Sequence, residues 1–185
     1  MGFMLLAMAS GVGDTTANGQ NAYGSAMFNA VVYVLTTLGT FGMIMLLARN
    51  GHEAEEIKDL SGLAKRSPWF ALLLTIFMFS LAGIPPTGGF YAKLAVLQAV
   101  IATGSTLYLY LAIAAVVLSL IGAFYYLRVV KVMFFDEPTD THALAVPADA
   151  KIVMSLNGVA VLAFGILPSG LMTWCVYAIR QALTT

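Results

Sequence analysis

The chain has 185 residues, of which 60% are hydrophobic and 10% are charged, and its formal net charge is zero. A soluble domain is about half apolar and about a quarter charged, so this composition indicates a membrane protein, and the neutral balance argues against a nucleic-acid partner. The single cysteine excludes an internal disulfide, and together with two dispersed histidines it offers no spacing suited to metal ligands.

The first apolar stretch, residues 1–9, is too short to cross a bilayer, which takes about 20 residues. It lacks a basic region in front of it, so it is also a poor signal peptide. It runs into a Gly/Asn/Thr-rich segment at 10–26, which we expect to be an outer loop. The pattern is typical of the end of a truncated helix, and we therefore expect the C-terminal part of a longer protein.

Uninterrupted apolar runs predict the remaining elements by the same length criterion. In chain order they are a transmembrane helix at 27–49, a loop at 50–67, a broken transmembrane helix at 68–102, a transmembrane helix at 105–135, a loop at 136–151, a transmembrane helix at 152–167 and an interfacial tail helix at 169–183. Trp174 and Tyr177 are the aromatic anchors expected of the tail helix. The predicted fold class is an all-α membrane protein with four crossings.

The second crossing is broken at 84–89 by Pro85, Pro86, Gly88 and Gly89. Consecutive prolines free backbone groups that lipid cannot satisfy, so such a break is tolerated only where protein buries it or where it lines a wet cavity. Discontinuous helices of this kind form the ion sites of transporters.

Lys93 is the one charged residue between positions 68 and 100. An ammonium at the centre of a membrane helix costs about 2.5–3.5 kcal/mol, and all nine acidic residues fall in the expected loops. Desolvation without a partner favours the neutral amine, so this lysine is a candidate for taking up and releasing a proton. Its counter-charge would come from a missing part of the protein or from another subunit.

Two other interpretations of Lys93 remain. The first is a lysine that snorkels to the interface, but Ala102 lies nine residues further on, about 13 Å of helix, which is beyond the reach of the side chain. The second is a structural ion pair with another subunit.

Polar residues elsewhere in the spans are less informative. Tyr33, Thr36, Thr37 and Thr40 could line a water path, but helical threonines more often bond to their own backbone or to a neighbouring helix, and the same holds for Ser119 and Asn157.

The basic residues are distributed asymmetrically. Seven of them lie in or beside two of the predicted loops, namely Arg49, Lys58, Lys65, Arg66, Arg128, Lys131 and Lys151, whereas Arg180 is alone on the other side. The positive-inside rule predicts that the loops at 51–67 and 136–151 face the cytoplasm and that the C-terminus faces out.

Several segments resemble the subunit N family of bacterial NADH–quinone oxidoreductases, the respiratory complex I subunit whose mitochondrial counterpart is subunit 2. These segments are SPWF at 67–70, FSLAGIPPT at 79–87, GFYAK at 89–93, YYLRVV at 125–130 and LP at 167–168. The resemblance covers essentially the whole chain, as part of helix ten to helix fourteen of a fourteen-helix subunit. It implies an antiporter-like fold of two inverted repeats, of which this chain holds the second, with Lys93 as a proton relay at the broken helix.

The resemblance also implies a function. The chain would be a proton-translocating, multi-pass subunit of a translocase in the bacterial inner membrane, coupled to quinone reduction elsewhere in the complex. NAD, FMN, iron–sulfur clusters and quinone would bind partner subunits, and no cofactor-binding motif is expected here. The partners would be other membrane subunits and the lipid bilayer. The alternatives are a subunit of a cation/proton antiporter or of a membrane-bound hydrogenase, and a non-transporting membrane scaffold.

Overall fold

The structure is a computed structural model that describes residues 1–14, 16–48, 56–138 and 146–184. Every secondary-structure element in these ranges is helical. In chain order the elements are α1 (Gly2–Gly11), α2 (Ala17–Leu47), η1 (Ile57–Leu60), α3 (Leu63–Arg66), α4 (Pro68–Ala82), α5 (Gly88–Ala102), α6 (Thr106–Phe135), α7 (Ala148–Ile166) and α8 (Ser169–Thr184).

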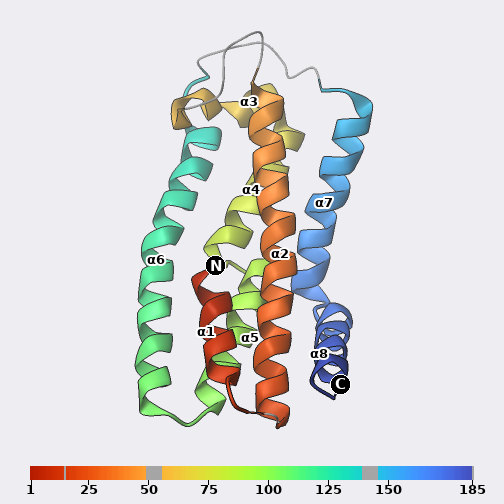
Figure 1. Cartoon of the computed structure of the whole chain (residues 1–185). Coiled ribbons are helices and arrows are strands. Elements are labelled where there is room, and N and C mark those ends of the chain that lie inside the picture. The colour runs from red at the N-terminus through yellow and green to blue at the C-terminus, as the bar shows by residue number, and fades with distance from the viewer. Residues whose placement is uncertain (15, 49–55, 139–145, 185) are drawn as a thin grey trace.

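The helices form a bundle around α2, which contacts α1, α4, α5, α7 and α8. Figure 1 shows α4 and α5 stacked end to end behind α2, with α6 along one side of the bundle and α7 along the other. The inner side of α6 contacts α4 and α5, while most of its large apolar side chains are exposed. Exposure of this kind is expected of a helix that faces lipid or another membrane protein.

Three helices, α2, α6 and α7, are long and apolar enough to cross a membrane by length and composition. Helices α4 and α5 have 15 residues each, which is about 22 Å of helix and short of the hydrocarbon core of about 30 Å. Stacked end to end, they make one discontinuous crossing. The predicted fold class, an all-α membrane protein with a discontinuous helix, is confirmed.

Small residues allow the helices around the broken crossing to approach closely. Gly39 of α2 lies against the fully buried ring of Phe77 on α4, and Gly42 lies against Met154 of α7. Such close approach is the usual way in which membrane helices gain packing energy. It holds α4 between α2 and α7 and so fixes the position of the break.

The structure differs from the outer loop expected at 10–26. Helix α2 already begins at Ala17, and the Thr16 hydroxyl caps it by accepting a hydrogen bond from the backbone N–H of Asn18 at 3.3 Å. Hydropathy marks the part of a helix that is apolar rather than the whole helix, and the first turns of α2 carry polar asparagines and a glutamine. These turns extend past the apolar span.

The interruption spans residues 83–87 rather than 84–89, because Gly88 and Gly89 form the first turn of α5. A Cβ at Gly89 would collide with the backbone carbonyl of Ser80, so glycine is needed for α5 to start this close to α4. The expected loop at 50–67 contains η1 and α3. Residues 49–55 and 139–145 of the two expected cytoplasmic loops lie outside the described residues.

Candidate functional site

Lys93 lies on α5, and its side chain reaches back to the C-terminal end of α4. Its Nζ atom donates hydrogen bonds to the backbone carbonyls of Leu81 at 3.1 Å and Ala82 at 2.8 Å. A third hydrogen bond, of 2.8 Å, goes to the hydroxyl oxygen of Ser119 on α6. The three N–H groups of an ammonium therefore have three neutral acceptors.

The C-terminal end of α4 has free carbonyl oxygens that can accept hydrogen bonds from Lys93. The last four carbonyls of a helix have no partner within the helix, and here all four are satisfied locally. The backbone N–H groups of Gly83 and Ile84 donate to the carbonyl of Phe79, and that of Gly83 also donates to the carbonyl of Ser80. Lys93 serves the other two. Because the carbonyl end of a helix carries partial negative charge, α4 itself supplies the electrostatic complement of the ammonium.

Gly83 makes room for the lysine. Its φ of 83° lies in the left-handed region, which ends α4 at no steric cost to a residue without Cβ. A Cβ at this position would lie 2.8 Å from Cδ and 3.0 Å from Nζ of Lys93. Glycine is thus required here both by the turn and by the path of the lysine side chain.

An aromatic ring lies beside the ammonium. The ring centroid of Phe3 on α1 is 5.6 Å from Nζ of Lys93, within the range of a cation–π interaction. The half-buried lysine side chain therefore points into the helix junction and away from the end of α5. The snorkelling interpretation does not describe this structure.

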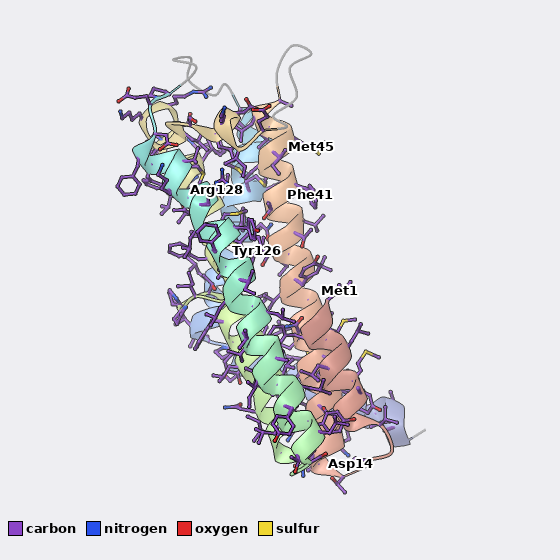
Figure 2. The ribbon with its side chains drawn as sticks, turned by 90° about the vertical axis from the view of Figure 1, so that its left-hand side faces the viewer. Met1, Asp14, Phe41, Met45, Tyr126 and Arg128 are labelled. Atoms are coloured by element: carbon purple, nitrogen blue, oxygen red, sulfur yellow. The ribbon has the colours of Figure 1, made fainter. Side chains whose placement is uncertain are left out.

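A cavity of about 160 Å³ adjoins Lys93. Its polar lining comes from Asn29 and Tyr33 of α2 and from Tyr126 of α6, among other residues. Met1 also lines the cavity, and Figure 2 shows it beside α2 and lower along the bundle than Tyr126. A cavity of this size with several polar groups is large enough for water molecules.

Hydroxyl groups join the wall of this cavity to both halves of the broken helix. Thr36 Oγ1 donates to the carbonyl of Val32 at 2.8 Å and lies 3.0 Å from Ser80 Oγ. Ser80 Oγ in turn accepts from the backbone N–H of Gly89 at 3.2 Å. Thr40 bonds to its own helix, as expected, whereas the buried Thr37 hydroxyl has no protein partner.

The residues predicted from the sequence are only partly brought together. Lys93, Gly88 and Gly89 meet at the junction of α4 and α5, while Pro85 and Pro86 are exposed at the break. Sequence reasoning missed the role of Ser119, although it is the one polar side chain between positions 111 and 124. The sequence also led us to expect a charged partner for Lys93 outside this chain. The acceptors on α4 could not be predicted, because they are main-chain groups that are not visible in the sequence. Across the described ranges, no cluster of three His, Cys, Asp or Glu side chains could hold a metal ion.

Comparisons with known proteins point in one direction. The sequence profile of the family described as NADH:quinone oxidoreductase/Mrp antiporter, TM matches residues 1–122. NADH-quinone oxidoreductase subunit N of Polaromonas naphthalenivorans is 56% identical over 188 residues, which cover 100% of this chain and 38% of that protein. The same subunit of Thiobacillus denitrificans is 57% identical over 179 residues, which cover 97% of this chain and 35% of that protein. The chain thus spans between 35% and 38% of the length of these relatives.

The fold also has a counterpart among solved structures. A chain of respiratory complex I from Thermus thermophilus with bound aureothin superimposes with a TM-score of 0.68 and 24% sequence identity, over 92% of this chain and 42% of that chain. At this level of identity the likeness concerns the fold alone.

Proposed function

Because the chain belongs to the NADH:quinone oxidoreductase/Mrp antiporter transmembrane family, we propose that it forms part of the proton path of an NADH–quinone oxidoreductase. Lys93 is the proposed proton relay. The observation that carries this proposal is the position of the amine, held at the carbonyl end of a half-helix and beside a polar cavity. Half-helix ends that face a cavity at membrane depth are the sites where transporters bind ions.

The chemistry of the site suits a reversible proton exchange. The α4 carbonyls and the Phe3 ring stabilise the charged form, while the surrounding apolar helices favour the neutral form. A lysine can change between the two, whereas arginine stays charged in proteins. The cavity beside the amine provides space for the water that would deliver or remove the proton.

The proposed protein works as one subunit of a larger complex. NAD, FMN, iron–sulfur clusters and quinone would bind partner subunits, and the energy of quinone reduction would reach this chain through the other membrane subunits. The names of the relatives support this assignment. We place the complex in the bacterial inner membrane, with residues 51–67 and 136–151 on the cytoplasmic side, as the distribution of basic residues favours.

A second candidate is a subunit of a cation/proton antiporter. The family description covers Mrp antiporters as well as quinone oxidoreductases, and a lysine at a broken helix would serve either. Copurification with quinone-reductase partners or with antiporter partners separates the two. A subunit of a membrane-bound hydrogenase and a non-transporting scaffold are the remaining alternatives. Copurification with hydrogenase partners tests the first, and the substitutions described next test the second.

Substitution of Lys93 in the intact complex tests the relay. We expect Lys93→Met to lower coupled proton pumping by about a hundredfold or more, the scale of a lost general acid–base group. It also leaves the carbonyls of Leu81 and Ala82 unpaired, at about 1–3 kcal/mol each, so the amount of assembled complex has to be measured in parallel.

Lys93→Arg is the decisive variant. Arginine keeps donors for the α4 carbonyls, so we expect the complex to assemble, but the permanent charge prevents proton exchange and pumping should stay low. A structural ion pair or a scaffold predicts the reverse, an arginine variant that assembles and pumps normally. That result would overturn the relay.

A further inference from the structure

Ser119 reaches the broken helix from α6, a different helix from the α4 and α5 that form the break. It lies on α6, whose side chains between positions 111 and 124 are otherwise apolar and largely exposed. Its hydroxyl oxygen is 2.8 Å from Nζ of Lys93, as close as the carbonyl of Ala82. Ser119 is therefore the one side chain that hydrogen-bonds the amine, whose other two acceptors in the described structure are main-chain carbonyls.

The three acceptors differ in what they can do when the lysine loses a proton. The ammonium has three N–H donors, and each acceptor takes one of them. The neutral amine keeps two N–H donors and gains a lone pair, which needs a donor. The carbonyls of Leu81 and Ala82 can only accept, whereas a hydroxyl can accept or donate by rotating its hydrogen.

We propose that Ser119 is a positioning residue that satisfies Lys93 in both protonation states, accepting from the ammonium and donating to the neutral amine. To release a proton, the ammonium rotates about its Cε–Nζ bond until one N–H points to water in the adjoining cavity. After the transfer, the two remaining N–H groups return to the α4 carbonyls, and the Ser119 hydroxyl turns its hydrogen toward the lone pair. No heavy atom has to move. This inference rests on the proposed function, because only a lysine that exchanges its proton needs a partner of both kinds.

The surroundings of the amine offer few competing groups. The titratable side chains that line the adjoining cavity are Lys93 itself and the phenols of Tyr33 on α2 and Tyr126 on α6; Met1 lines it as well, and no described carboxylate does. From α1 the amine meets the Phe3 ring, and from α4 it meets main-chain carbonyls. Ser119 is therefore the group through which a change in hydrogen bonding can be tested on its own.

Threonine and valine have nearly the same shape and differ by the hydroxyl, so they form a matched pair at position 119. In the intact complex we expect Ser119→Thr to pump within about threefold of the wild type. Ser119→Val should pump about tenfold to a hundredfold more slowly, as the loss of a hydrogen bond to a charged group predicts. Ser155→Ala is the control, because Ser155 of α7 accepts from the indole of Trp69 and donates to the carbonyl of Lys151, remote from this contact. Assembly is quantified for every variant.

Equal pumping by the threonine and valine variants, at normal assembly, would overturn the inference, since a packing role does not distinguish them. The single variant Lys93→Met, measured in parallel, separates this inference from the proposed function. If Lys93→Met abolishes pumping and the two Ser119 variants are equal, the relay stands and the role of Ser119 falls. If Lys93→Met pumps normally, the proposed function itself fails, and this inference fails with it.

Discussion

Gly83→Ala offers a test of the lysine site that does not replace a titratable residue. Gly83 has φ of 83°, and Gly104, at the end of α5, has φ of 67°. An L-residue in this region costs about 1–2 kcal/mol, so alanine at either position should lower the free energy of unfolding by that amount. The two sites differ in what the new Cβ meets. At Gly104 it meets nothing within 4 Å, whereas at Gly83 it lies 2.8 Å from Cδ of Lys93.

The contact at position 83 has to be relieved, and the flexible end of Lys93 is what gives way. Each hydrogen bond lost from the ammonium costs about 1.5–3 kcal/mol, so Gly83→Ala should destabilise the protein by at least about 1.5 kcal/mol more than Gly104→Ala. Thermal unfolding of the purified protein measures the loss of stability. Proton uptake into vesicles by the assembled complex measures the effect on pumping. We expect pumping about tenfold lower for Gly83→Ala and near the wild-type value for Gly104→Ala. Equal stability and equal pumping of the two variants would refute the proposed fit between Gly83 and Lys93.

Two further predictions concern packing and orientation. Gly39→Ala should lower the free energy of unfolding by about 1–3 kcal/mol, because its Cβ would collide with the buried ring of Phe77. The control is Gly122→Ala, which has open space around it and should be neutral or slightly stabilising. Similar unfolding midpoints for the two variants would contradict the packing described here. A cysteine introduced at Asn18 should react with an impermeant thiol reagent in intact cells, and one at Lys58 should react only after the membrane is opened. The opposite labelling pattern would invert the assigned topology.

The sequence was sufficient to predict the membrane class and the broken crossing. Both follow from effects that are local along the chain: apolar runs of limited length, and prolines that lack a backbone N–H. The boundary of α2 was not predictable in the same way, because its polar first turns continue the helix beyond the apolar span. Helix length and membrane span are different quantities, and hydropathy reports only the second.

The candidate site was half predictable. Lys93 is conspicuous as a lone charge among apolar residues, but its partners are not. The carbonyls of Leu81 and Ala82 become acceptors only because Gly83 ends α4 at that point and the side chain of Lys93 on α5 reaches back to them. Ser119 lies 26 positions after Lys93 on another helix, and its contact depends on the rotation of α6 about its axis. A largely exposed helix without a strong amphipathic pattern gives no sequence signal for that rotation.

Gly165 of α7 packs directly against the backbone of the break and so connects it to the rest of the bundle. A Cβ there would strike the backbone of Pro86 and Thr87, so α7 bears directly on the main chain of the interruption. A few residues later the chain turns into α8, which rests on α2 where Val176 meets Gly24. Close-packed helices transmit displacement instead of absorbing it. We therefore expect a motion that parts the two halves of the crossing on this side to displace α7 and α8, and a spectroscopic label on the exposed face of α8 would report such movement at the break.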